Sequence, residues 1–145
     1  MTPDGQDAQK AYDALAARLV LPLQQGQDVA ILCEGDPLFY GSFAEVMHRL
    51  AERFPVSVVP GVSAAHAAAA ALPLTLVQRN ECWTVLPAPL PTSTLEAMLG
   101  ATNAAAILKL GRHYHRVRAL LDRMGLTPHA YCCLLYTSPS PRDAS

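Results

Sequence analysis

The stretch of sequence that decides the fold is Val29-Ala30-Ile31-Leu32-Cys33-Glu34-Gly35-Asp36-Pro37-Leu38-Phe39-Tyr40-Gly41-Ser42. Its first five residues form an unbroken apolar run, which predicts a strand buried on both faces in a parallel sheet. The run ends at Glu34-Gly35-Asp36-Pro37, a turn that combines a permissive glycine with a proline of fixed φ. The stretch therefore predicts a strand that leaves its sheet through a tight loop.

A helix is expected directly after this loop. Ser42 and Glu45 have the spacing of a capping box, in which each side chain bonds the backbone of the other residue. The apolar residues that follow recur at helical spacing, and we expect the helix to end near Phe54-Pro55. Loops between parallel strands and helices are where open α/β sheets bind ligands.

The same pattern is repeated once more along the chain. Val56–Val59 is a predicted strand, Pro60-Gly61-Val62-Ser63 its exit loop, and Ser63 a predicted cap for a helix over Ala64–Ala71. Because parallel strands point their exit loops to one edge, the two loops are expected side by side. Before them, a helix from Asp7 to about Leu21 is expected to end or kink at Pro22, with Gly26 as a stop.

The second half of the chain continues the α/β alternation, and we place a domain boundary near Arg79-Asn80. This gives an N-terminal α/β domain over residues 1–79 and a C-terminal α/β domain over residues 80–133. In the second domain we expect a strand over Cys82–Leu86, a helix from a capping box at Ser93–Glu96 to Gly100, and a strand over Ala104–Leu110. A second helix follows, which ends at Gly125 and has Tyr114, Val117, Leu121 and Met124 on one side. The last expected element is a strand from His129 to about Cys133.

The last twelve residues, 134–145, do not continue this pattern. Pro139 and Pro141 remove backbone donors, and the serines around them offer nothing apolar to bury. We interpret residues 134–145 as a non-native tail without specific packing, and we exclude them from the fold.

The composition and net charge of the chain argue against some classes of binding partner. The 145 residues carry a net charge of −1 and 51% are apolar, so there is a sizeable core and no basic stripe for nucleic acid or for an anionic membrane. Neither a signal peptide nor a membrane span is expected, and none of the four cysteines has a CxxC spacing. We therefore expect a cytoplasmic protein with reduced thiols.

The loop that contains Gly35 and Asp36 has two possible interpretations. Gly35 could let the backbone approach a ligand and Asp36 could accept hydrogen bonds from it, or the loop could be a tight turn with a polar rim. The glycine spacing matches neither a P-loop nor a dinucleotide fingerprint. The side chains of His113 and His115 would point in different directions on a helix, so no metal site is expected. No catalytic base can be assigned from the sequence.

Three segments together resemble a known family. They are Cys-Glu-Gly-Asp-Pro-Leu-Phe-Tyr-Gly-Ser-Phe from Cys33, Val-Val-Pro-Gly-Val-Ser-Ala from Val58, and Ala-Ile-Leu-Lys-Leu-Gly-Arg from Ala106. The chain resembles the tetrapyrrole (corrin/porphyrin) methylases, and within them the enzymes that methylate precorrin-2 at C20. The resemblance implies methyl transfer from S-adenosylmethionine to a tetrapyrrole carbon in cobalamin biosynthesis.

The resemblance also implies an architecture and a site. It implies two α/β domains with S-adenosylmethionine in the cleft between them, and a homodimer. Carried over by motif, the cofactor-binding residues would be Glu34, Gly35, Asp36, Phe39, Ser63, Ala64 and Leu110.

The chain departs from the family at its start, because the family begins with a strand and a Gly-x-Gly-Pro-Gly-Asp loop that this sequence does not contain. The expectation is therefore an internal fragment of the enzyme. Three alternatives stay open: a methylase for another corrinoid, a methylase for rRNA, and a noncatalytic nucleotide-binding α/β module. The substrate could be metal-free precorrin-2 or its cobalt form.

Overall fold

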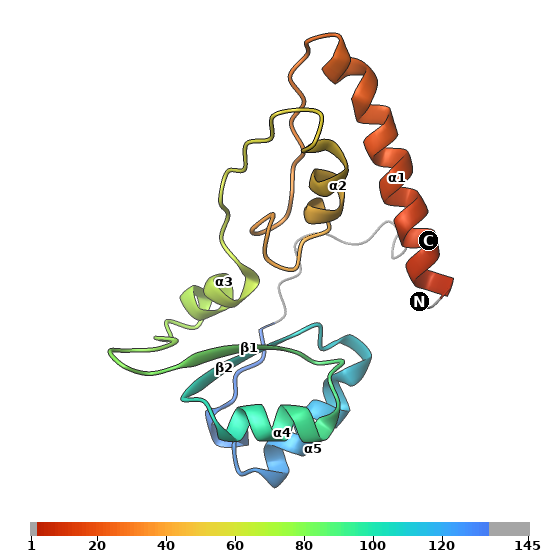
Figure 1. Ribbon diagram of the computed structural model, residues 1–145. Coiled ribbons are helices and arrows are strands. Elements are labelled where there is room, and N and C mark those ends of the chain that lie inside the picture. The colour runs from red at the N-terminus through yellow and green to blue at the C-terminus, as the bar shows by residue number, and fades with distance from the viewer. Residues whose placement is uncertain (1–2, 134–145) are drawn as a thin grey trace, which may run out of the picture. The chain divides into compact units, whose positions relative to one another are not determined.

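A computed structural model describes residues 3–133 (Figure 1). The chain divides into two compact units, Met1–Ala64 and Ala65–Ser145, which are taken separately below. The predicted domain boundary near Arg79-Asn80 falls inside the second unit, and it stays a prediction.

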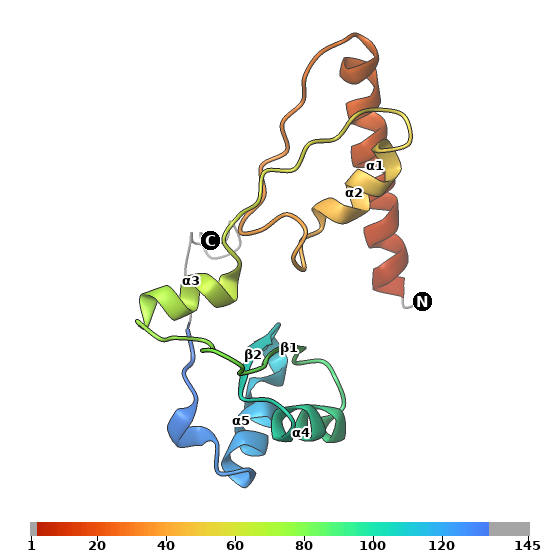
Figure 2. The same ribbon diagram turned by 60° about the vertical axis from the view of Figure 1, so that its left-hand side comes forward.

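Two helices form the frame of the first unit. They are α1, Pro3–Gln24, and α2, Phe43–Leu50, which lie side by side in both views (Figures 1 and 2). Ala16 of α1 is buried against Val46 and Leu50 of α2. As predicted, the apolar positions of α2 share one face, and this face is what holds it to α1.

Arg49 joins the polar sides of these two helices. Its guanidinium donates to Asp13 at 2.6 Å and to Gln9 at 2.6 Å on α1, and to the Glu45 carboxylate at 3.1 Å on its own helix. These charge-assisted bonds raise the pKa of Arg49, with the bond to Asp13 as the largest cause. The network fixes α2 lengthwise along α1, which a purely apolar contact would not do.

The first helix is longer than predicted, because Pro22 does not end it. Helix α1 continues through Pro22 to Gln24, and Gly26 follows with a φ of +75°. Only Leu23 and Gln24 follow Pro22 in this helix, so a kink at the proline would change the direction of little of α1. Gly26 is the stop that the sequence predicted.

The two strands predicted for the first unit are absent among its described residues. Val29–Cys33 and Val56–Val59 are extended, but neither forms a backbone hydrogen bond to another described backbone group. Leu32 is 95% exposed and Val59 80% exposed, so the first prediction of a strand buried on both faces is also wrong here. A strand of this kind needs neighbours on both edges, and within residues 3–133 these two segments have none.

Neither capping box forms. Ser42 makes no side-chain bond at the start of α2, where the N–H of Glu45 instead donates to the Ser42 carbonyl. Pro91 is the N-cap of the helix α4, Thr92–Gly100, again without a side-chain cap. In the first case the Glu45 carboxylate is engaged by Arg49, which explains why it does not reach back to Ser42.

The second unit contains the only sheet within residues 3–133. Strand β1, Trp83–Pro87, pairs in parallel with β2, Ala104–Leu108, with Trp83 opposite Ala104 and Pro87 opposite Leu108. Helix α4 connects the strands, and α5, Tyr114–Arg123, follows β2 after a short 3₁₀ turn, η1, Gly111–His113. This is the predicted strand–helix–strand–helix order, with β2 ending two residues earlier than expected.

The core of the second unit lies between the sheet and its two helices. Leu86 of β1 and Leu95 of α4 are fully buried, and they pack with Val117 and Leu120 of α5. Both helices cover the same face of the sheet (Figure 1). On α5 the buried residue is Leu120 rather than the predicted Leu121, which packs at the edge of this cluster.

Two further elements complete the described chain. Helix α3, Ala64–Ala71, has the predicted bounds, and the ring of its residue His66 lies edge to face with that of Trp83, with centroids 5.3 Å apart. The strand predicted from His129 is wrong: the 3₁₀ turn η2, Thr127–His129, occupies its start, and residues 130–133 are not a strand. The predicted tail over 134–145 lies outside the described residues.

Candidate functional site

The two glycine loops of the first unit are tied together by one carboxylate. Asp36 Oδ2 accepts a hydrogen bond from the backbone N–H of Gly61 at 2.9 Å, and Asp36 Oδ1 accepts one from the N–H of Leu38 at 2.9 Å. The loops Glu34–Gly41 and Pro60–Ala64 therefore lie side by side as predicted, but the parallel sheet whose edge was predicted to carry them is absent among the described residues of the first unit. Both oxygens of Asp36 are engaged by backbone groups.

Glycines at these loops make the close approach possible. A Cβ on Gly61 would lie 2.2 Å from the carbonyl oxygen of Gly35, and a Cβ on Gly41 would lie 2.7 Å from that of Pro37. Gly35 itself has a φ of +74°, which other residues rarely adopt. A ligand contact and a tight turn were both possible for Gly35 from the sequence, and in the structure Gly35 contacts the second loop.

Aromatic side chains form the far side of the first loop. The N–H of Phe39 donates to the Asp36 carbonyl at 3.2 Å, which closes a tight turn. The rings of Phe39 and Tyr40 meet edge to face with centroids 5.0 Å apart, and Tyr40 has a φ of +57°. Phe39 is half-buried and Tyr40 is exposed, so the loop presents apolar surface beside its polar backbone.

The backbone around Asp36 favours its charged form. The hydrogen bond from the Gly61 N–H lowers the pKa of Asp36 below its ordinary value, and the N–H of Leu38 acts in the same direction. Asp36 is therefore an ionised acceptor at neutral pH. It is suited to hold loops in place and unsuited to donate a proton.

The remaining predicted site residues are distributed over both units. Glu34 is exposed at the start of the first loop, Ser63 is buried at the end of the second, and Ala64 is exposed at the first position of α3. Leu110 belongs to the second unit, where it packs against the Leu86–Leu95 cluster. The structure thus brings together Gly35 and Asp36 with the loop that contains Ser63.

Sequence reasoning missed two residues with clear positional roles. Gly61 supplies the N–H that binds Asp36, and the Pro-Gly pair was its only signal. Arg116 of α5 donates to the carbonyls of Ala88 and Leu90 and to the Thr92 hydroxyl, so it holds the loop after β1.

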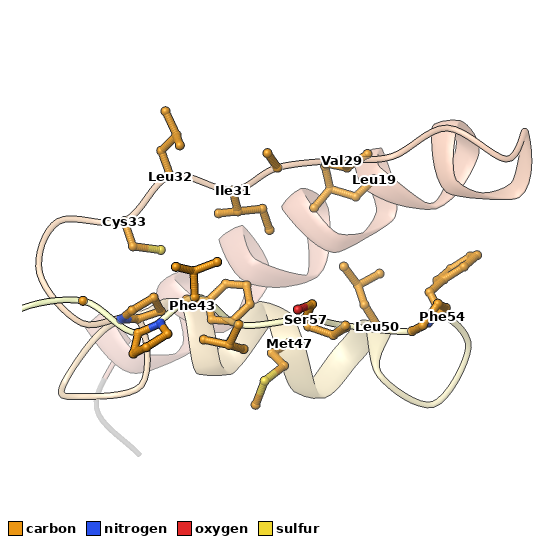
Figure 3. A pocket seen from close by; sticks show the side chains of 18 of the residues that line it. Leu19, Val29, Ile31, Leu32, Cys33, Phe43, Met47, Leu50, Phe54 and Ser57 are labelled. Atoms are coloured by element: carbon orange, nitrogen blue, oxygen red, sulfur yellow. The ribbon is translucent and has the colours of Figure 1, made fainter.

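A cavity of about 540 Å³ opens beside the paired loops (Figure 3). Gly35, Pro37 and Gly61 line one end of it, while Leu19 and Phe43 belong to the helices that line its interior. Figure 3 shows Val29, Ile31 and Cys33 along one side, and Phe54 and Ser57 along the other. Most of the lining is apolar.

Within the described part of the chain, no group of His, Cys, Asp or Glu side chains could hold a metal ion. All four cysteines are free thiols. Residues 3–133 contain no helix that is both long and apolar enough to cross a membrane.

The parallel pair of strands joined by a helix makes this an α/β protein. The sequence model of the family "Tetrapyrrole (Corrin/Porphyrin) Methylases" matches residues 1–136. The chain belongs to this family, as its loop motifs predicted.

Curated relatives narrow the comparison. The chain is similar to the cobalamin biosynthesis protein CobIJ of Mycobacterium tuberculosis, with 42% identity over 120 residues, which are 83% of this chain and 24% of that protein. It is similar to the precorrin-2 C(20)-methyltransferase of a Sinorhizobium species, with 41% identity over 114 residues, which are 79% of this chain and 46% of that protein. The cobalt-precorrin-2 C(20)-methyltransferase of Salmonella typhimurium is 23% identical over 126 residues, 87% of this chain and 53% of that protein. The chain therefore spans between a quarter and about half of the length of these relatives.

Proposed function

We propose that the full-length protein transfers a methyl group from S-adenosylmethionine to C20 of precorrin-2, a step of cobalamin biosynthesis. The relatives named as C(20)-methyltransferases support this proposal, and one of them is 41% identical over most of this chain. The observation that carries it is the Asp36–Gly61 bond, because it assembles the family's two loop motifs into one surface.

The residues of these loops fit the methyl donor that the proposal requires. Glu34 offers an exposed carboxylate, which can accept hydrogen bonds from an ammonium or hydroxyl group. Phe39 offers a half-buried ring for apolar contact.

When bound, S-adenosylmethionine supplies a sulfonium methyl group that is already activated for transfer to a nucleophilic carbon. The task left to the protein is therefore alignment of the two reactants and removal of water. In the proposed site Asp36 acts as a positioning residue, since both of its oxygens hold loop backbone. No proton-transfer role is assigned to a residue of this chain, which agrees with a donor that needs no activation by a base.

The test is turnover by the full-length protein with S-adenosylmethionine and enzymatically prepared precorrin-2. The proposal expects a product heavier by one methyl group, with the new carbon at C20 by nuclear magnetic resonance. Parallel reactions with cobalt-precorrin-2 separate the two forms of the substrate. Methylation at another ring position, or binding of S-adenosylhomocysteine without any turnover, would contradict the C20 assignment.

A second tetrapyrrole substrate has one observation in its favour. The chain is 32% identical over 114 residues to the precorrin-4 C(11)-methyltransferase of Rhodococcus erythropolis. Precorrin-4 therefore belongs among the substrates tested. We also propose a homodimer as the working form of the full-length protein, to be tested by its mass in solution.

A further inference from the structure

We propose that the basic loop, Lys109–His113, which follows β2 in the second unit, binds carboxylate side chains of the tetrapyrrole. Arg112 is the residue that holds one of these carboxylates. The inference rests on the proposed function, because it takes precorrin-2 or a related tetrapyrrole as the ligand. It concerns the second unit by itself.

Positive charge is concentrated in this part of the chain. The segment between Glu96 and Asp122 has no acidic residue, and it contains the cations Lys109, Arg112, Arg116 and Arg118. Because the whole chain has a net charge of −1, this excess of cations is local. A local excess of one sign of charge attracts ligands of the opposite sign.

Two of these cations have structural partners, and Arg112 differs from them. Arg116 donates to the Leu90 carbonyl at 3.0 Å, and Arg118 forms an ion pair with Asp122 at 3.3 Å. The guanidinium of Arg112 is exposed, and in the described part of the chain it makes no hydrogen bond or ion pair. A ligand can therefore reach Arg112 without displacing a protein partner.

The stability of α5 does not explain the charge of Arg112. This residue lies in η1, directly before α5, and the first turn of α5 has no acidic residue. The amino end of a helix carries a partial positive charge, so a cation is favoured at the opposite end. Arg112 is therefore at the end of the helix where its charge is unfavourable, and a bound carboxylate would offset this.

The backbone of the basic loop is held in place on both sides of Lys109. Lys109 has a φ of +58°, a conformation that persists in residues other than glycine only where the surroundings fix it. Before Lys109, the carbonyl of Leu108 accepts the N–H of Ala88 at 2.8 Å, and after it Leu110 packs against the buried core. Strained residues of this kind are concentrated at ligand sites. A loop that is already fixed also loses little freedom when a ligand binds.

The basic loop lies where α/β sheets commonly bind ligands. Strands β1 and β2 are parallel, and their last residues, Pro87 and Leu108, are opposite each other. Both strands therefore leave the sheet at the same edge, and the basic loop follows one of these exits. Open α/β sheets bind ligands outside the carboxyl ends of their strands.

The charges of the two proposed reactants favour the tetrapyrrole as the ligand of this loop. Tetrapyrroles of the precorrin type carry acetate and propionate side chains, and an arginine can bind a carboxylate through two parallel hydrogen bonds. S-adenosylmethionine has a single carboxylate, which its ammonium and sulfonium groups outweigh. A loop with exposed cations and no acidic residue attracts the first reactant and disfavours the second.

The test measures binding of sirohydrochlorin, the oxidised and more stable form of precorrin-2, to the full-length protein. We expect Arg112→Gln to weaken this binding roughly tenfold, as for the loss of a charge-assisted hydrogen bond, and to leave the affinity for S-adenosylhomocysteine unchanged. The matched control is Arg118→Gln, which removes the same charge at another exposed position and should change neither affinity. Circular dichroism of both variants confirms equal helix content before the comparison.

Further measurements separate the charge of Arg112 from an effect on the fold. Added KCl should weaken binding by the wild type more steeply than binding by Arg112→Gln, because the variant has lost an attraction that salt screens. Arg112→Lys should have an intermediate affinity, since it keeps the charge and loses the planar fork. In turnover, Arg112→Gln should raise KM for precorrin-2 and leave kcat unchanged, because the contact is made away from the reacting carbon.

Three outcomes would overturn the inference. Equal affinities of the wild type and Arg112→Gln for sirohydrochlorin would make Arg112 a solvated side chain. A loss of affinity for S-adenosylhomocysteine alone would assign Arg112 to the carboxylate of the methyl donor. Absence of sirohydrochlorin binding by the wild type would remove the ligand itself. The proposed function fails separately, if the methyl group is found away from C20 while sirohydrochlorin still binds through Arg112.

Discussion

Asp36 and Gly61 lie 25 residues apart in the sequence, and the carboxylate of the first accepts the backbone N–H of the second at 2.9 Å. Because Asp36 also accepts the N–H of Leu38, one side chain sets the shape of its own loop and the position of the neighbouring loop. Three predictions test this bond and the glycine that takes part in it, and a fourth tests the core of the second unit.

Removing the carboxylate should separate the loops. In the full-length protein, Asp36→Ala should weaken binding of S-adenosylhomocysteine roughly tenfold, as expected for the loss of a charge-assisted hydrogen bond. Isothermal calorimetry measures this directly. The control is Asp7→Ala, since Asp7 makes only an exposed ion pair with Lys10 at 3.5 Å. Unchanged affinity in Asp36→Ala would remove the loop pair from the binding site.

The Asp36–Gly61 bond should also depend on pH. The hydrogen bonds lower the pKa of Asp36 below its ordinary value of 3.8, so the charged form is favoured in the folded protein. The stabilisation is therefore present above about pH 4 and is lost as the pH falls through the lower folded pKa. The amide resonance of Gly61, followed by nuclear magnetic resonance, should shift in that acid range.

Asp122 provides the control for this titration, because hydrogen bonds from Thr127 and Arg118 lower its pKa as well. Asp36→Asn should abolish the shift at Gly61, whereas Asp122→Asn should leave it intact. A Gly61 titration that survives in Asp36→Asn would assign the effect to another group.

A side chain on Gly61 should force the loops apart. In Gly61→Ala the new Cβ would lie 2.2 Å from the Gly35 carbonyl oxygen, and overpacking of this kind costs about 1–3 kcal/mol. Gly100→Ala is the matched control, since a Cβ there meets no atom within 4 Å. Urea unfolding should show a lower midpoint for Gly61→Ala only. Equal midpoints would mean that the loops yield without cost.

The core of the second unit should respond to a cavity at its centre. Leu95 of α4 is fully buried among Leu86, Val117 and Leu120, so Leu95→Ala should lower the free energy of unfolding by about 2–5 kcal/mol. Met98 on the same helix is 40% exposed, and Met98→Ala should cost much less. Denaturant titration of the two variants compares them. A small effect at Leu95 would mean that the cluster collapses around the missing side chain.

The second unit was largely predictable from its sequence, because each of its elements finds its partner nearby in the chain. The apolar runs at Cys82–Leu86 and Ala104–Leu110 pair with each other, and the helix between them covers the sheet that they form. One error in this unit concerned the start of α4, where Pro91 is the N-cap in place of the expected serine.

The strands of the first unit could not be predicted in the same way. The run Val29–Cys33 correctly indicates extended backbone, but pairing depends on residues that the local pattern does not contain. For the candidate site, we predicted that the two loops lie side by side because parallel strands would point their exit loops to the same edge of a sheet. The specific bond could not be predicted, because nothing in the sequence tells whether Asp36 points to a ligand or to the Gly61 amide.

The arrangement of contacts in the two units has a consequence for the order of folding. The second unit closes over short distances in the chain: the side chain of Asn103 binds the backbone of Cys82, 21 residues earlier. In the first unit, Arg49 reaches Gln9 across 40 residues. Because folding slows as contacts become more distant in sequence, the second unit should collapse faster once it has been made. During synthesis α1 leaves the ribosome before α2, so its polar side is held only once Arg49 has been made, and the two loops can meet only once Gly61 has been made.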